Sequence, residues 1–175
     1  EPGTLVSGSF TNGLDADVKT LGSQLDVVMR PGREGWMFPW NWVSGQGLHW
    51  DFGFTAAIPL DLTFETGAAE TRLNLETLQV RNLTLKTGAS STEITLPARA
   101  GMTQVKIEAG AAAVNIRVPD GVAARVEAEA GLASVDVDAS RFPGEGKYFQ
   151  SSDYDSAENK VHIRVETGLG SIQIR

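Results

Sequence analysis

The chain has 175 residues, with 22 acidic and 15 basic side chains, and therefore a formal net charge of −7. This length suits one compact domain or at most two small ones, and 41% hydrophobic residues exclude a disordered chain. The absence of Cys excludes disulfides, thiolate metal sites and cysteine nucleophiles. The acidic balance argues against nucleic acid as a partner. No apolar run approaches the length of a membrane-spanning helix.

The chain opens with Glu1-Pro2-Gly3, without Met and without a leader of charged and then apolar residues. We expect a processed chain or a piece of a longer protein, with any signal peptide or membrane anchor upstream.

Residues 1–57 are predicted to form divergent opening strands and a Trp-rich capping segment. Residues 12–18 and 21–27 resemble a repeated unit that recurs later in the chain. Trp50, Phe52 and Phe54 alternate, which predicts a strand with one aromatic face over residues 48–55.

All four Trp lie between residues 36 and 50, and Trp36, Phe38, Trp40 and Trp42 alternate. Such a row could bind sugars by stacking or lie at a membrane interface. It could instead plug the open end of the repeats, as terminal units must. We favour the plug, because a contiguous exposed aromatic patch would threaten solubility.

The second part of the chain contains an internal repeat. Its anchors are Gly67, Gly88, Gly110, Gly131 and Gly168, with spacings of 21, 22, 21 and 37 residues. The sequence around each glycine is nearly the same, as in Leu-Thr-Phe-Glu-Thr-Gly-Ala-Ala at 62–69 and Val-Lys-Ile-Glu-Ala-Gly-Ala-Ala at 105–112. A fixed period of this length indicates a repeat architecture.

Each unit alternates apolar and polar residues on both sides of its glycine. In the first unit, Leu62 and Phe64 precede Gly67, and Leu73 and Leu75 follow it. This period of two predicts strands with one buried face. A turn with positive φ, or a tight corner where units stack, would select glycine between them. A phosphate-binding loop is disfavoured, because no P-loop Lys and no helix follow the glycines.

Two all-β architectures fit these units. One is a β-solenoid, similar to a parallel β-helix, built from repeats of about 21 residues. The other is an antiparallel hairpin meander or sandwich. In a solenoid, units stacked in sequence order would place opposite charges side by side, and we therefore favour this architecture. The expected pairs of opposite charge are Arg72 with Glu93, Lys106 with Glu127 and Arg117 with Asp138. One expected pair, Glu108 with Glu129, has like charges.

We predict a repeat solenoid over residues 58–175. Together with the segment 1–57, it is expected to form one continuous domain. The 37-residue spacing contains a polar, turn-rich excursion over residues 143–159. The final unit has no evident cap, and its open edge would invite pairing unless the excursion covers it.

Catalytic and metal-binding patterns are weak, so we expect no enzyme and no cofactor. His49 and His162 lack the spacing of zinc ligands or of a catalytic triad. Asp153, Asp155 and Glu158 could offer oxygen ligands to calcium, but they lack the pattern of an EF-hand loop, and a solvated loop is favoured. A glycosidase with two carboxylates is a less favoured alternative.

From residue 58 to residue 172 the chain resembles the toast-rack or LiaF-like family of bacterial cell-envelope proteins. The motifs that carry this resemblance are Ile58-Pro59-Leu60-Asp61-Leu62, the repeated Thr-Gly-Ala units, Leu96-Pro97, Val118-Pro119-Asp120-Gly121-Val122, Tyr148…Ser151…Tyr154…Ala157-Glu158-Asn159-Lys160, and Gly168-Leu169-Gly170-Ser171-Ile172. They cover about two-thirds of the chain.

This resemblance implies a solenoid-like domain displayed outside the membrane behind helices or a lipid anchor. Some relatives restrain a histidine kinase in envelope-stress sensing, and others are called adhesins. We therefore expect a non-catalytic extracytoplasmic interaction or scaffold domain. Its partner would be an envelope membrane protein, a cell-wall polymer, or an identical chain end to end. A carbohydrate-binding module that uses the Trp-rich segment is the alternative.

Overall fold

The computed structural model describes residues 5–10, 14–22, 24–31 and 50–175. These residues form an all-β protein, and none of them lies in a helix. The strands are β1 (Val6–Phe10), β2 (Leu14–Leu21), β3 (Gln24–Pro31), β4 (Trp50–Phe54), β5 (Leu60–Asn74), β6 (Val80–Thr95), β7 (Met102–Arg117), β8 (Ala123–Val137), β9 (Gly144–Glu145), β10 (Tyr148–Gln150) and β11 (Lys160–Ile174).

The chain divides into two compact units, residues 1–55 and 56–175. Strand β4 pairs with β1 of the first unit. In the first unit, β1 and β4 form one antiparallel pair and β2 and β3 form another. The aromatic alternation over 48–55 gives β4, and the rings of Phe10 and Trp50 meet edge to face at 5.3 Å between their centroids.

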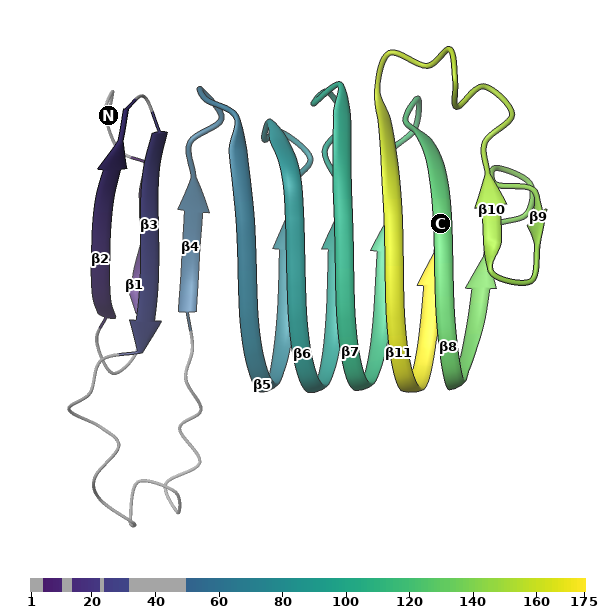
Figure 1. Ribbon diagram of the computed structural model, residues 1–175, viewed down its shortest axis with the longest axis horizontal. Coiled ribbons are helices and arrows are strands. Elements are labelled where there is room, and N and C mark those ends of the chain that lie inside the picture. The colour runs from purple at the N-terminus through teal and green to yellow at the C-terminus, as the bar shows by residue number, and fades with distance from the viewer. Residues whose placement is uncertain (1–4, 11–13, 23, 32–49) are drawn as a thin grey trace. The chain divides into compact units, whose positions relative to one another are not determined.

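The second unit is built from five long strands that pair in parallel. The strand order in its sheet is β5-β6-β7-β11-β8-β10-β9. Each long strand turns back on itself midway, at the lower edge of the stack in Figure 1, and so contributes two legs. The antiparallel meander therefore does not describe these strands, because their pairing is parallel in both legs.

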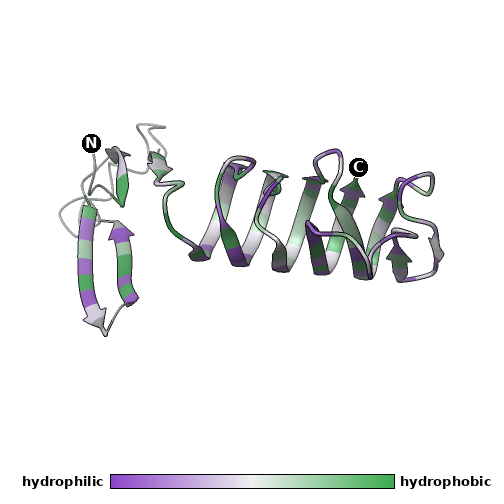
Figure 2. Cartoon of the chain, turned by 90° about the horizontal axis from the view of Figure 1, so that it is seen from above, coloured by the Kyte–Doolittle hydropathy of each residue, from purple (hydrophilic) through white to green (hydrophobic). Residues whose placement is uncertain are grey.

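Alternate residues of the long strands build the core between the two legs. Figure 2 shows the corresponding bands of hydrophobic and hydrophilic residues along the strands. Residues at equivalent positions stack across all five strands, so each apolar side chain contacts its counterparts on the neighbouring strands. One such row is Leu62, Leu83, Val105, Ile163 and Val126, and all of its members are buried.

The last long strand is not at the end of the stack. β11 lies between β7 and β8 (Figure 1), because the excursion first pairs with the outer edge of β8 and then returns across it. Three charge pairs expected from sequence order are therefore wrong. Arg164 separates Lys106 from Glu127, Glu166 separates Glu108 from Glu129, and Arg175 separates Arg117 from Asp138.

The fourth expected pair is present, since it lies before this insertion. Arg72 and Glu93 are direct neighbours on β5 and β6, with Arg72 Nε 3.7 Å from Glu93 Oε2.

The excursion is fixed to the stack by buried polar contacts. Ser151 is buried, and its hydroxyl accepts a hydrogen bond of 2.9 Å from the backbone N–H of Ala124. The side chain of Asn159 accepts another from the N–H of Gly101. Such contacts satisfy backbone groups that the sheet leaves unpaired. Strand β10 then covers the outer edge of β8 beside Arg125–Glu127.

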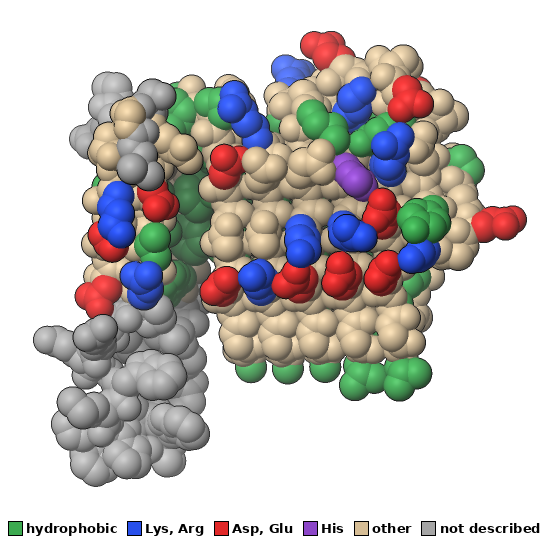
Figure 3. Space-filling model, viewed as in Figure 1, with side chains coloured by type: hydrophobic (Ala, Val, Ile, Leu, Met, Phe, Trp, Pro, Cys, Tyr) green, Lys and Arg blue, Asp and Glu red, His purple; other side chains and the backbone are tan. Residues whose placement is uncertain are grey.

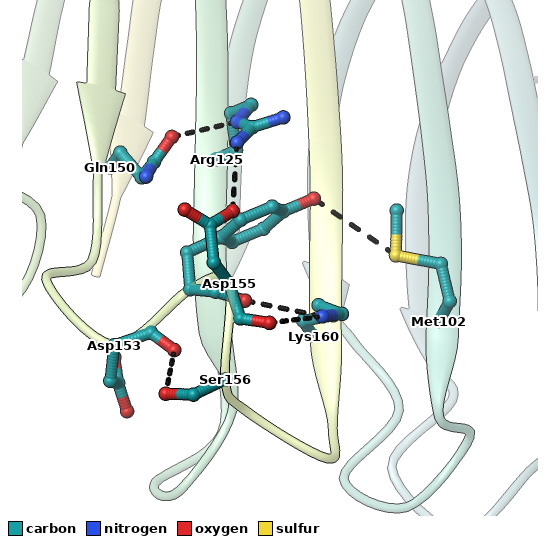
Figure 4. Close-up of polar contacts among 8 residues, drawn as sticks. Met102, Arg125, Gln150, Asp153, Asp155, Ser156 and Lys160 are labelled. Atoms are coloured by element: carbon teal, nitrogen blue, oxygen red, sulfur yellow. Dashed lines mark hydrogen bonds and ion pairs between the residues drawn. The ribbon is translucent and has the colours of Figure 1, made fainter.

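Arg125 joins the excursion to the sheet (Figure 4). Its Nε donates to Gln150 Oε1 at 2.7 Å, and its Nη2 lies 3.4 Å from Asp155 Oδ1. Its guanidinium lies 4.3 Å from the centre of the Tyr154 ring, a cation–π contact. Burial raises the pKa of the Tyr154 hydroxyl, so this residue is neutral at physiological pH.

Candidate functional site

The outward face of the first legs carries charges in rows. The row nearest the bend, which we call the acidic row, runs across five strands and is visible in Figure 3. Lys86 lies 3.7 Å from Glu65 within it, and Lys147 of the excursion binds Glu129 at 2.9 Å. In stacking order, the acidic row is Glu65, Lys86, Glu108, Glu166 and Glu129.

Cations next to the acidic row hold its carboxylates in the charged form. A hydrogen bond from Lys106, together with its charge, lowers the pKa of Glu108. Lys147 lowers the pKa of Glu129 in the same way. These groups therefore remain negative at physiological pH, and they form an ordered row of charges on a flat sheet.

A second outward row, formed by Lys106, Arg164 and Glu127, runs above the acidic row. Arg164 lies 3.5 Å from Glu127 and 3.6 Å from Glu166, so it links the two rows. His162 Nε2 is 3.5 Å from Glu127 Oε1, and among the described residues this buried nitrogen has no hydrogen-bond partner.

The acidic row also borders an open groove of about 1510 Å³. Inward residues of β8, among them Ala128, Ala133 and Val135, line it as well. A groove of this kind can accept a polar chain or a protein surface. Four of the repeated glycines complete its lining, Gly67, Gly110, Gly131 and Gly168.

An apolar edge, which we call the bend ridge, follows the repeated glycines. It consists of Ala68, Ala89, Ala111, Leu169 and Leu132, which are direct neighbours in that order. Leu132 is 84% exposed and Leu169 is 50% exposed. Figure 3 shows hydrophobic side chains projecting along this lower edge. Leucines this exposed on a rigid edge are available to a partner.

Close stacking requires four of the five repeated glycines. A Cβ on Gly88 would lie 2.8 Å from the carbonyl oxygen of Gly67, and similar approaches of 2.8 to 2.9 Å occur at Gly110, Gly168 and Gly131. None of the five has a positive φ, so the tight corner, rather than a left-handed turn, accounts for glycine at these four positions.

Among the described residues, the carboxylates of the excursion do not join this surface. Trp36, Phe38, Trp40, Trp42 and His49 lie outside the described residues. Asp155 is in the ion pair with Arg125. Asp153 and Glu158 are exposed in the excursion.

The described parts of the chain contain no group of three or more His, Asp or Glu side chains placed to hold a metal ion. They also contain no helix long and apolar enough to span a membrane.

Sequence reasoning did not single out Leu132 and Leu169 as candidate binding residues. Their signal was present, because the position after the glycine is Ala in three units and Leu in two. It also did not connect Lys147 with Glu129, since 18 residues separate them and only the hairpin of β9 and β10 brings them together.

The fold and this surface define a class of all-β proteins in which long, bent strands stack in parallel with equivalent residues in register. Two family models match the chain. The N-terminal domain of toast_rack matches residues 5–117, and the C-terminal domain of the cell wall-active antibiotics response protein LiaF matches residues 67–174. The chain therefore belongs to the toast-rack/LiaF-like family, as the sequence motifs predicted.

A solved structure from Clostridium sporogenes, described as a "putative cell adhesion protein", has the same fold. Its TM-score is 0.85 at 18% sequence identity, and the match covers 99% of this chain and 84% of the other. A search of curated proteins found no match.

Proposed function

We propose that this chain is a non-catalytic, extracytoplasmic interaction domain of a bacterial cell-envelope protein. In this proposal, the second unit is a β-solenoid-like scaffold made of repeats of about 21 residues. The observation that carries the proposal is the bend ridge beside the acidic row, which together offer apolar and charged contacts on one rigid edge. The matching family model is named for the response to cell wall-active antibiotics, and this name supports a location in the cell envelope.

The chemistry of the charged face supports a non-catalytic role. A general acid needs a carboxyl group whose pKa is raised towards neutrality, usually by burial. Here Lys106 and Lys147 lower the pKa of Glu108 and Glu129 instead. These glutamates lie on an open sheet face, which does not shield them from water as the active site of a glycosidase would.

The partner we propose is a membrane protein of the envelope, with a role in envelope-stress sensing. A cell-wall polymer and a second copy of this chain are the other candidates. The domain would be held at the membrane by an anchor in the full-length protein. A partner with an apolar patch bordered by basic residues would match the bend ridge and the acidic row.

Binding to solubilised envelope membranes tests this proposal. The double variant Leu132→Ser/Leu169→Ser removes the apolar contacts at the most exposed part of the bend ridge. The matched control is Leu25→Ser, which changes a 46% exposed leucine on β3 of the first unit. We expect the double variant to lose most of the bound material and the control to retain it. Equal binding by all three proteins would reject the bend ridge as the contact surface.

The alternation of Trp36, Phe38, Trp40 and Trp42 supports a second candidate, binding of cell-wall carbohydrate by stacking. Titration of cell-wall glycans followed by Trp fluorescence tests it. A saturable change in emission would support this function, and an unresponsive emission would exclude it.

A further inference from the structure

The outer edge of β8 is only partly covered. β11 pairs with the inner edge of β8 along both legs. On the outer edge, β10 pairs only with Arg125–Glu127 in the first leg. No strand among the described residues pairs with the outer edge of the second leg, Leu132–Val137, which we call the free edge.

The inward side chains of the free edge lack one neighbour. Ala133, Val135 and Val137 point into the stack but are half-exposed. Their counterparts on β7 are completely covered, with exposed fractions of 4%, 0% and 2% for Ala112, Val114 and Ile116. One more strand on the free edge would therefore bury apolar surface that the stack leaves open.

The backbone of the free edge is also available. The N–H of Asp138 donates to Ile174 O of β11 at 3.0 Å. Because N–H and C=O groups switch sides at each residue of a strand, those of Ala133, Val135 and Val137 face away from β11. The free edge thus presents a regular set of hydrogen-bonding groups, the arrangement to which an extended chain adds as a further strand.

A second copy of this chain does not fit there. An added long strand of the same bent shape would need a place beside Val126 for its first leg and a place beside Val135 for its second. β10 already occupies the place beside Val126, since Phe149 pairs with it. Neighbouring strands are only about 4.8 Å apart. The free edge therefore suits a single extended segment.

The charges around the free edge are mainly acidic. Glu129, Asp136 and Asp138 lie on or beside it. Arg164 also acts on Glu129, but it is paired with Glu127 and Glu166; the cations that pair directly with these carboxylates are Lys147 and Arg175. Both cations are already bound, Lys147 to Glu129 and Arg175 to Asp136. Asp138 is bound by the hydroxyl of Ser140, which carries no charge. An incoming segment with basic side chains would complement these carboxylates.

We propose that the free edge binds an extended, positively charged segment of a partner protein by β-strand addition. Its alternate apolar side chains would cover Ala133, Val135 and Val137, and its basic side chains would face Asp136 and Asp138. The free edge begins at Leu132, the last residue of the bend ridge, but it binds through backbone groups and inward side chains that the bend ridge does not use. The proposal therefore goes beyond the function given above, and peptide binding at the free edge can be tested whether or not a partner binds the bend ridge.

Short synthetic peptides test the proposal on the full chain. The probe alternates Val and Lys over eight residues, and its binding is measured by fluorescence anisotropy. We expect saturable binding, which a peptide of alternating Val and Glu does not show. N-methylation of one alternate set of peptide amides should abolish binding, because those amides face the free edge, while methylation of the other set should be tolerated.

Variants of the protein locate the binding site. Val135→Pro removes an edge-facing N–H and should abolish binding, whereas the matched control Val135→Thr retains this N–H and should bind. If Val135→Pro does not fold, the two methylated peptides give the same test on the unchanged protein. Absence of saturable binding at millimolar peptide would overturn the proposal. So would equal tolerance of both methylation patterns, or undiminished binding by folded Val135→Pro.

Discussion

A Cβ atom on Gly110 would lie 2.9 Å from the carbonyl oxygen of Gly88 on the neighbouring strand. Real Cβ atoms do not come this close to backbone oxygens, so any side chain at this position would push two strands of the stack apart. Gly67 lies at the first strand, and among the described residues nothing comes within 4 Å of the Cβ it would carry.

Gly110→Ala should therefore destabilise the protein, while Gly67→Ala should have little effect. Overpacking of this kind costs about 1 to 3 kcal/mol. Urea unfolding followed by circular dichroism measures the difference. Equal stability of the two variants would show that stacking of the bend glycines is not what requires them.

Ile163→Ala should be strongly destabilising, because Ile163 is fully buried on β11 between Val105 and Val126. Deleting a buried side chain of this size costs about 2 to 5 kcal/mol. The exposed Leu132→Ala should change stability by less than about 0.5 kcal/mol. A small effect of Ile163→Ala in thermal unfolding would contradict the position of β11 inside the stack.

Ser151→Ala should destabilise the protein by about 1 to 3 kcal/mol, because it leaves the buried N–H of Ala124 without its acceptor. The neighbouring Ser152 is exposed, so Ser152→Ala serves as the control and should have no measurable effect. Amide hydrogen exchange gives a direct readout, since the Ala124 amide should exchange faster only in Ser151→Ala. Unchanged exchange would mean that another group replaces the hydroxyl.

Stability should fall at acidic pH. Hydrogen bonds from Arg175 and Gln173 lower the pKa of Asp136, and Lys147 lowers that of Glu129. A carboxyl group whose pKa is lower in the folded than in the unfolded state stabilises the fold above its unfolded pKa. This contribution is lost as the pH falls from the ordinary values of 3.8 for Asp and 4.5 for Glu through the folded values.

Urea unfolding at pH 7 and pH 3 should therefore show lower stability at pH 3. Asp136→Asn should lower stability at pH 7 and reduce the loss between the two pH values, because its amide does not titrate. A stability that is the same at both pH values in the unchanged protein would contradict this assignment.

The sequence predicted strands, their alternation and the family, because a period of two and a repeated glycine are local signals. Leu62, Leu83 and Val105 stack in sequence order, as a regular repeat implies. Ile163 does not, since its neighbours are Val105 and Val126. The position of β11 in the strand order depends on how the excursion crosses β8. This is a long-range contact, and it leaves no periodic pattern in the sequence.

The candidate surface was only partly predictable for the same reason. The outward charges Arg72 and Glu93 could be paired from their spacing, because β5 and β6 are consecutive in both sequence and space. The placement of Arg164 beside Lys106 could not be predicted, since it exists only because β11 enters between β7 and β8. Leu132 and Leu169 would be neighbours in either order, and the insertion decides only that Leu169, rather than Leu132, lies beside Ala111.

We propose that the bend ridge is a binding surface, and site-specific photocross-linking in envelope membranes tests this most directly. A photoreactive side chain is placed at Leu132, at Leu169, or at Leu25 as the control. We predict that positions 132 and 169 give the same discrete cross-linked partner, identified by mass spectrometry, and that position 25 does not. No cross-linked product at 132 and 169, or the same products at all three positions, would contradict the claim.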